Sequence, residues 1–238
     1  MFPFYYWLPE VHCEANISIS LLLAGLLLKL SLYGIIRFIL STFFISLRYL
    51  SSLIIVLTVI GILIITCSLF RYFDLKKIIA LSSIIHLNTA FISLFSLSTI
   101  GLLATIIISL SHSLSSIALF LFTGLLINKS SSRYVESINF MYIGLRTVLF
   151  LIILANLSFP GSINFISELV NIIALYSIDY LLCYYFLFLS LFTTILWFIL
   201  FNIKLPFNYC FNLIYLHYFI LFYLLFIIYY LGFYLLLL

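Results

Sequence analysis

The chain has 238 residues, of which 67% are hydrophobic and 7% charged, and its mean hydropathy is +1.40. Soluble domains are about 45–50% apolar and about 25% charged, so this composition excludes a water-soluble globular fold. With 10 basic and 6 acidic residues, the chain also lacks the charge of a nucleic-acid-binding or disordered protein. We therefore expect an all-α polytopic membrane protein with a single membrane domain over residues 1–238.

Apolar segments between charged or polar residues predict the transmembrane helices in chain order. Each segment is long enough to cross the hydrocarbon core, which takes roughly 20 apolar residues. The uninterrupted spans are expected at Ile17–Phe38, Leu53–Phe70, Ile78–Leu97, Ile100–Ile127, Cys183–Ile203 and Leu213–Leu238. The most polar stretch, Asn128–Arg146, is expected to be a surface loop. No stretch has the alternating polarity of a barrel strand.

The segment Thr147–Tyr180 has a different character, because Pro160-Gly161 interrupts it. It is too long for one straight crossing and too short for two with a turn. Proline removes a helix donor and clashes with the preceding turn. We therefore expect one discontinuous helix, broken near Pro160–Asn164, which gives seven crossings in total. Broken helices recur at ion sites in transporters.

The basic residues predict the orientation of these seven spans. One side would receive Arg71, Lys76, Lys77, Lys129, Arg133, Arg146 and Lys204, and the other Arg37 and Arg48. This is a clear positive-inside bias. It would weaken if Thr147–Tyr180 crossed twice, because Lys204 would then change sides. The N-terminus is accordingly expected on the basic side and the C-terminus on the opposite side.

Four ionisable residues, Lys29, His86, His112 and Glu168, fall inside four separate predicted helices. A lysine at the bilayer centre costs about 2.5–3.5 kcal/mol on insertion scales. Burial disfavours its charged form, which makes its proton labile. Histidine titrates near neutral pH and suits a proton shuttle. One ionisable group per helix is the pattern of an in-membrane proton relay, although each group could instead be a paired or hydrogen-bonded structural residue.

Serines share a helix face with each of the two histidines. Ser82 and Ser83 precede His86 by four and three residues, with Ser93 further along, and Ser109 and Ser116 flank His112. These stripes predict a hydrated polar track along both helices. His217 has no polar neighbours and is expected to be a packing residue.

No redox motif accompanies this pattern. Cys13, Cys67, Cys183 and Cys210 have no CxxC spacing and are expected to be apolar packing residues. There is no haem or iron–sulfur ligand spacing, P-loop or GxGxxG motif. We therefore expect neither a cofactor nor a metal in this chain.

Five motifs in order over about 170 residues resemble the chain 4 family of NADH:ubiquinone oxidoreductase, respiratory complex I. Trp7–Ala15 (WLPEVHCEA) resembles the WLPEAHVEA signature, and Leu21–Phe38 resembles LAGxLLKxGxYGxxRF. Asp74–Asn88 (DLKKIIALSSIIHLN) is similar to DLKKIIAYSSxxHMN. Ser111–Leu126 resembles SHGLxSSALFxxxGxLY, and Ala155–Leu169 (ANLSFPGSINFISEL) resembles ANMSFPGTxNFIGEF.

The resemblance implies an antiporter-like fold, in which fourteen helices form two inverted halves. This chain would carry helices eight to fourteen. Lys29 would be the central lysine, His86 and His112 the connecting hydrated axis, and Glu168 the terminal carboxylate. The motifs also contain His12, Glu14, Ser83, Ser116 and Pro160, which we expect to support the relay. Protons would move in response to ubiquinone reduction, and the basic side would face the mitochondrial matrix.

The same resemblance implies the partners. FMN, iron–sulfur clusters and ubiquinone are expected elsewhere in the complex, and other membrane-arm subunits and lipids such as cardiolipin are expected around this chain. Tyr5 replaces a family histidine, and Ala15-Asn16 replaces the usual AP. The family's seven preceding helices and their lysine are absent from this sequence. A split gene is therefore expected, in which a separate polypeptide carries the missing helices.

Two other functions fit the same residues. A subunit of a cation/proton antiporter complex would share the lysine and glutamate pattern. A non-conducting remnant that scaffolds the membrane arm would share the helices. The motifs match the chain 4 sequences in particular, which favours complex I over the antiporter complex. The four retained ionisable residues argue against the non-conducting remnant.

Overall fold

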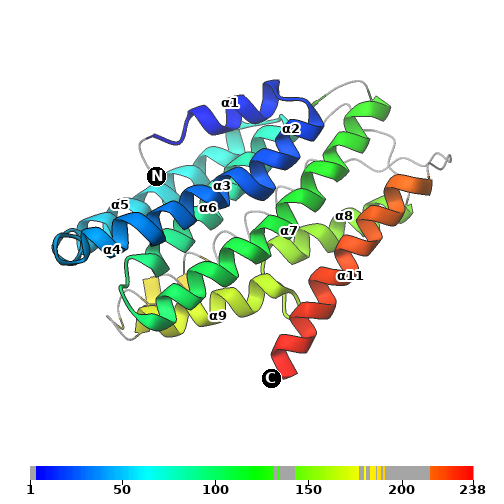
Figure 1. The fold of residues 1–238 in the computed structure, drawn as a ribbon. Helices are drawn as coiled ribbons and strands as arrows, with labels where there is room; N and C mark the ends of the chain where they lie inside the picture. Colours follow the sequence, from blue (N-terminus) through cyan, green and yellow to red (C-terminus); the bar gives the residue numbers. More distant parts are fainter. Residues whose placement is uncertain are drawn as a thin grey trace.

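A computed structural model describes residues 4–130, 133–134, 143–176, 180, 183–185, 187–188, 190 and 215–237. All elements in these ranges are helices, arranged as a bundle of long rods (Figure 1). Four of them are long and apolar enough to cross a membrane: Ile17–Thr42, Ser46–Arg71, Leu75–Leu94 and Thr99–Asn128. The predicted span Cys183–Ile203 and the predicted loop Asn128–Arg146 lie mostly outside the described residues.

The first long helix, Ile17–Thr42, is apolar and contains two wider turns. It consists of α2 (Ile17–Leu22), α3 (Leu28–Gly34) and α4 (Leu40–Thr42), joined by the π-helical turns Leu23–Leu27 and Ile35–Ile39. It therefore extends beyond the predicted end at Phe38. Large apolar side chains along it are exposed, so this rod lies at the edge of the bundle.

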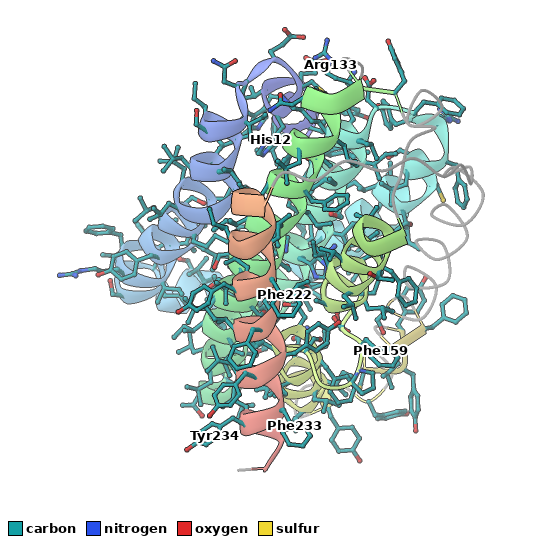
Figure 2. All side chains as sticks on the ribbon, turned by 90° about the vertical axis from the view of Figure 1, so that its right-hand side faces the viewer. His12, Arg133, Phe159, Phe222, Phe233 and Tyr234 are labelled. Carbon is teal, nitrogen blue, oxygen red and sulfur yellow. The ribbon has the colours of Figure 1, made fainter. Side chains whose placement is uncertain are left out.

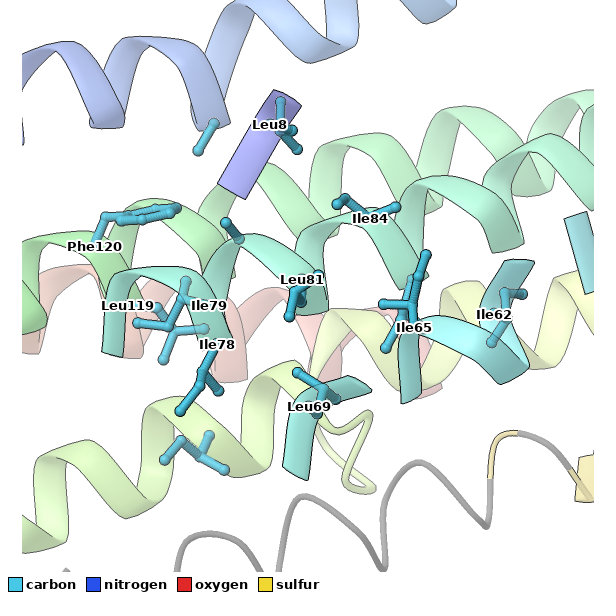
Figure 3. Close-up of a cluster of buried hydrophobic side chains, with 14 of the residues drawn as sticks. Leu8, Ile62, Ile65, Leu69, Ile78, Ile79, Leu81, Ile84, Leu119 and Phe120 are labelled. Atoms are coloured by element: carbon cyan, nitrogen blue, oxygen red, sulfur yellow. The ribbon is translucent and has the colours of Figure 1, made fainter. Parts of the chain in front are cut away.

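The centre of the bundle is α6 (Leu75–Leu94), most of whose residues are buried. It packs between α5 (Phe44–Ser68) and α7 (Thr99–Ser130), and α5 begins well before the predicted start at Leu53. Their shared core consists of interlocked aliphatic side chains. Figure 3 shows Ile62, Ile65, Leu69, Ile78, Leu81 and Leu119 among them.

The short helix α1 (Trp7–Glu14) lies against α6 and is held there by two cations. The Lys76 ammonium donates a hydrogen bond to the Ala15 carbonyl at 2.8 Å, and the Arg133 guanidinium donates one to the Cys13 carbonyl at 2.9 Å. The last carbonyls of a helix have no partner within it, and basic side chains there also oppose its dipole favourably. His12 and Arg133 consequently lie at the same end of the bundle (Figure 2).

The discontinuous segment consists of α8 (Ile143–Asn156), a break, and α9 (Ile163–Tyr176). The break therefore begins at Leu157, before the predicted position, and Asn164 already belongs to α9. Its start is set upstream of Pro160 by Ser158, which has a φ of +58°; Gly161, directly after the proline, has a φ of +96°. A left-handed residue ends a helix before any proline can.

The last described helix, α11 (Tyr215–Leu237), packs against α7, α8 and α9. The Tyr229 hydroxyl donates a hydrogen bond of 2.9 Å to the Leu151 carbonyl of α8. Gly232 lies directly against the backbone of the break at Gly161 and Ser162. This helix therefore braces the discontinuous segment from one side.

Candidate functional site

Lys29 lies in α3 next to a π-helical turn, and its ammonium donates a hydrogen bond to the Ala24 carbonyl in that turn. A π turn widens the helix and often occurs at functional sites. Here it offers a carbonyl oxygen to a lysine that an apolar helix could not otherwise satisfy. Leu32, three residues further along α3, lies in one buried cluster with Ala90 of α6 and Ile108 of α7, which are four residues from His86 and His112, respectively.

His86 of α6 and His112 of α7 form a stacked pair inside the bundle. Their ring centroids are 4.9 Å apart and the ring planes are inclined by 25°. His112 is 2% exposed, and neither of its ring nitrogens has a hydrogen-bond partner of good geometry among the described residues. The N–H bonds and lone pairs of stacked imidazoles lie in the ring planes, so a proton would pass between these two rings through a bridging water. The two predicted relay histidines are therefore in contact with each other.

The fourth predicted residue, Glu168, is held at the helix break. The hydroxyl of Ser158 donates a hydrogen bond of 2.6 Å to Oε1 of Glu168. The backbone N–H of Phe159 bonds the Leu154 carbonyl at 3.0 Å, so α8 ends in a Schellman motif with Ser158 at the left-handed position. Glycine usually occupies this position. A serine there places a hydroxyl where glycine would leave none.

A polar seam between α7, α8 and α9 separates the histidine pair from Glu168. Ser115 donates a hydrogen bond to Oδ1 of Asn156 at 3.2 Å, and Nδ2 of Asn164 donates to Ser115 at 3.5 Å. Ser111 donates to Ser167 at 3.4 Å. Polar side chains that bond across helices in a bundle interior hold those helices in one register.

The serines that were expected beside the two histidines form hydrogen bonds with backbone carbonyls of their own helices instead. Ser83 donates to the carbonyls of Ile79 and Ala80, and Ser116 donates to that of Ser113. Ser82 and Ser93 likewise bond carbonyls three residues earlier, and the bond of Ser109 is exposed. Such back-bonding is the usual state of serine in a helix. These hydroxyls therefore give no hydrogen bond to either imidazole.

The residues that do bond across helices were missed by the sequence analysis. They are Ser111, Ser115, Asn156, Ser158, Asn164 and Ser167. One signal was available: Asn164, Ser167 and Asn171 share a helix face at spacings of three and four residues. Asn171 and Asn88 are also buried, with no amide partner among the described residues.

The remaining predicted supporting residues lie apart from this group. His12 is fully buried in α1 and stacks on Phe120, with ring centroids 4.6 Å apart. Burial lowers the pKa of His12 to about 4, and the charges of Lys76 and Lys29 add to this shift. Glu14 is exposed at the end of α1, and Pro160 is exposed in the break.

No group of three or more His, Cys, Asp or Glu side chains that could hold a metal occurs among the described residues. Within the same ranges, Cys13, Cys67 and Cys183 are free thiols, and Cys210 lies outside them. The groups described above, on helices α3, α6, α7, α8 and α9, can exchange protons or form hydrogen bonds.

The comparison with known families agrees with the motifs. Residues 1–194 match the family described as "NADH:quinone oxidoreductase/Mrp antiporter, TM". The chain belongs to this family. Its sequence resemblance is thereby confirmed, and the match includes Lys29, His86, His112 and Glu168.

Curated relatives are NADH-ubiquinone oxidoreductase chain 4 proteins. The Marchantia polymorpha protein is 41% identical over 175 residues, which cover 71% of this chain and 34% of the relative. The Acanthamoeba castellanii protein is 36% identical over 183 residues, which cover 74% of this chain and 36% of the relative. The chain therefore spans about a third of the length of these relatives.

Solved structures confirm the antiporter-like fold. Respiratory complex I from Thermus thermophilus with bound NADH contains a chain that matches with a TM-score of 0.87 at 18% identity, over 98% of this chain and 51% of that chain. The Mrp complex from Dietzia sp. DQ12-45-1b matches with a TM-score of 0.75 at 20% identity, over 87% of this chain and 40% of that chain. The number of seven crossings stays a prediction.

Proposed function

We propose that this family member is a proton-translocating membrane-arm subunit of a complex I-type NADH:ubiquinone oxidoreductase. The observation that carries the proposal is the stacked pair of His86 and His112, with Lys29 on helix α3, which packs against the helices of both histidines. Protons would pass between Lys29, the two imidazoles and Glu168. This chain would do so as one subunit of the enzyme complex, without a cofactor of its own, while NADH oxidation and ubiquinone reduction take place in other subunits.

The physical argument is that each proposed carrier is in a setting that allows exchange. The Lys29 ammonium has one carbonyl partner, so a proton it gives up leaves no strong ion pair behind. The imidazoles face each other without competing hydrogen bonds of good geometry to His112. Buried polar groups without protein partners are costly unless water reaches them, which favours a hydrated interior around His112, Asn88 and Asn171.

We further propose that the chain lies in the mitochondrial inner membrane with its basic residues on the matrix side. Lys76 and Arg133 support this orientation, because both contact the same end of α1. Other membrane-arm subunits, lipids such as cardiolipin and a polypeptide that carries the preceding helices are the partners that follow from the family resemblance.

A second candidate is a subunit of a cation/proton antiporter complex. The family description and the Mrp complex from Dietzia sp. favour it. The two candidates differ in their coupling reaction, because only the first requires NADH. A native gel of the assembled complex, stained for NADH dehydrogenase activity and followed by mass spectrometry of the active band, separates them. The first candidate fails if the chain runs only in assemblies without that activity.

The relay itself is tested by Lys29→Met in membranes that contain the assembled complex. We expect proton pumping per NADH oxidised to be lost while the complex still assembles, because methionine keeps the packing and carries no proton. Lys77→Met is the matched control, since Lys77 lies over the Tyr72 ring outside the relay. A Lys29→Met complex that assembles and pumps normally would leave only the scaffold function.

A further inference from the structure

Asn156, the last residue of α8, lies where three helices meet. It is 2% exposed, and its Oδ1 accepts the hydrogen bond from Ser115 of α7. The hydroxyl of Ser115 also lies within hydrogen-bonding distance, 3.2 Å, of the His112 carbonyl. Through Ser115, Asn156 is therefore joined both to the helical turn that carries His112 and to the seam.

The same residue belongs to a clamp across the helix break. Nδ2 of Asn164 donates a hydrogen bond of 2.9 Å to the Ala155 carbonyl and a longer one of 3.5 Å to Ser115. An amide nitrogen only donates and an amide oxygen only accepts, so the chain of bonds runs from Asn164 through Ser115 to Asn156. The clamp joins the end of α8 to the start of α9 and satisfies a helix-end carbonyl.

Two residues beyond Asn156, Ser158 bonds Glu168 from a left-handed backbone conformation. A non-glycine residue persists in such a conformation only where its surroundings fix it. Here the clamp on one side and the hydrogen bond to Glu168 on the other fix the backbone conformation of Ser158. The turn after α8 is consequently tied to the helical turn that carries His112 at one end and to the glutamate at the other.

We propose that Asn156 is a positioning residue that couples the His86–His112 pair to the Glu168 end of the relay. It does so by holding the imidazoles and the helix break in one register. This inference rests on the proposed proton translocation and adds to it a specific residue outside the four ionisable groups. Asn156 itself carries no proton, because its amide neither ionises nor needs to rotate for this role.

The test is Asn156→Leu, which keeps the side-chain volume and removes the acceptor. We expect proton pumping per NADH oxidised to fall about two- to tenfold, the effect of one buried hydrogen bond. Asn156→Asp restores an acceptor for Ser115 and is expected to recover most of this ratio. The amount of assembled complex, read from a native gel, separates a coupling defect from a loss of protein.

Thr123→Val is the matched control, because Thr123 is buried on α7 and bonds only the Phe120 carbonyl of its own helix. If Asn156→Leu fails to assemble, Ser115→Ala removes the bridging hydroxyl alone and should lower the ratio in the same direction. An unchanged ratio in assembled Asn156→Leu or Ser115→Ala, or an equal fall in Thr123→Val, overturns the inference. A normal ratio in Lys29→Met would overturn the proposed function instead.

Discussion

The hydroxyl of Ser158 donates a hydrogen bond of 2.6 Å to Oε1 of Glu168, across the break between α8 and α9. Ser158 makes this bond from a φ of +58°, at the helix-end position that usually belongs to glycine. Left-handed backbone costs a non-glycine residue roughly 1–2 kcal/mol. The chain thus has a strained serine at the point where its hydroxyl reaches the partly buried carboxyl group of Glu168.

Replacing Ser158 by glycine or by alanine separates the strain from the hydrogen bond. Both variants lose the bond to Glu168, whereas only Ser158→Gly relieves the backbone. We expect both to lower proton pumping per NADH oxidised by a similar factor of about two to ten. Ser158→Ala should also lower the thermal stability of the complex relative to Ser158→Gly, by about 1 kcal/mol.

The measurements are the pumping ratio in membrane vesicles and the thermal midpoint of the purified complex. Ser113→Ala is a suitable control, because Ser113 is half-buried and its hydroxyl bonds only the Leu110 carbonyl of its own helix. A Ser158→Gly complex that pumps at the normal ratio would show that the hydrogen bond has no part in translocation.

The long helices were predictable because their apolar runs end at charged residues. The same reasoning found Lys29, His86 and His112, since a single ionisable residue in an apolar run is costly wherever the helix packs. The closeness of the two histidines follows from the order of the helices, because α6 and α7 are adjacent in sequence and pack along their length.

The hydrogen-bond partners of the serines were not predictable. A serine in a helix can bond a carbonyl one turn back or a side chain on another helix, and only the packing decides between them. Ser83 bonds only carbonyls of its own helix, whereas Ser115 lies 3.2 Å both from the His112 carbonyl and from Oδ1 of Asn156 on α8. Pro160 predicted a break in this segment, but its start at Leu157 was not predictable, because Ser158 shows no local preference for the left-handed conformation that ends α8.

Acid should loosen α1 through His12. Burial against Phe120 lowers the pKa of His12 to about 4, whereas an undocked α1 restores its ordinary value near 6.5. A lowered folded-state pKa means that docking is fully stable above pH 6.5 and is weakened as the pH falls toward 4. At pH 5.5 the loss should be about 1 kcal/mol.

Hydrogen exchange of the peptide that contains Trp7–Glu14 measures this effect between pH 7.5 and pH 5, after correction for the intrinsic rate. His12→Leu removes the titratable group and should abolish the pH dependence. If the variant and the native chain show the same pH profile, another group is responsible.

Neutralising Arg133 should also release α1, at any pH where the native helix is docked. Arg133→Gln weakens the bond to the Cys13 carbonyl and removes a positive charge from the helix C-terminus. We expect docking to weaken by about 0.3–1 kcal/mol. Lys77→Gln serves as the control, because Lys77 contacts the Tyr72 ring and not α1. Equal exchange rates for both variants would contradict a capping role.

Gly232→Ala should displace α11 from the helix break. A Cβ atom at this position would lie 2.3 Å from the Gly161 carbonyl oxygen and 2.6 Å from the Ser162 carbonyl carbon. Both contacts are with backbone, so no side chain can rotate to make room. We expect a loss of about 1–3 kcal/mol, as for other overpacked sites, seen as a lower thermal midpoint of the complex.

Gly34→Ala is the matched control, because a Cβ there has nothing within 4 Å. Alanine favours a helix over glycine, so Gly34→Ala should be neutral or stabilising. Equal midpoints for the two variants would show that α11 does not brace the break.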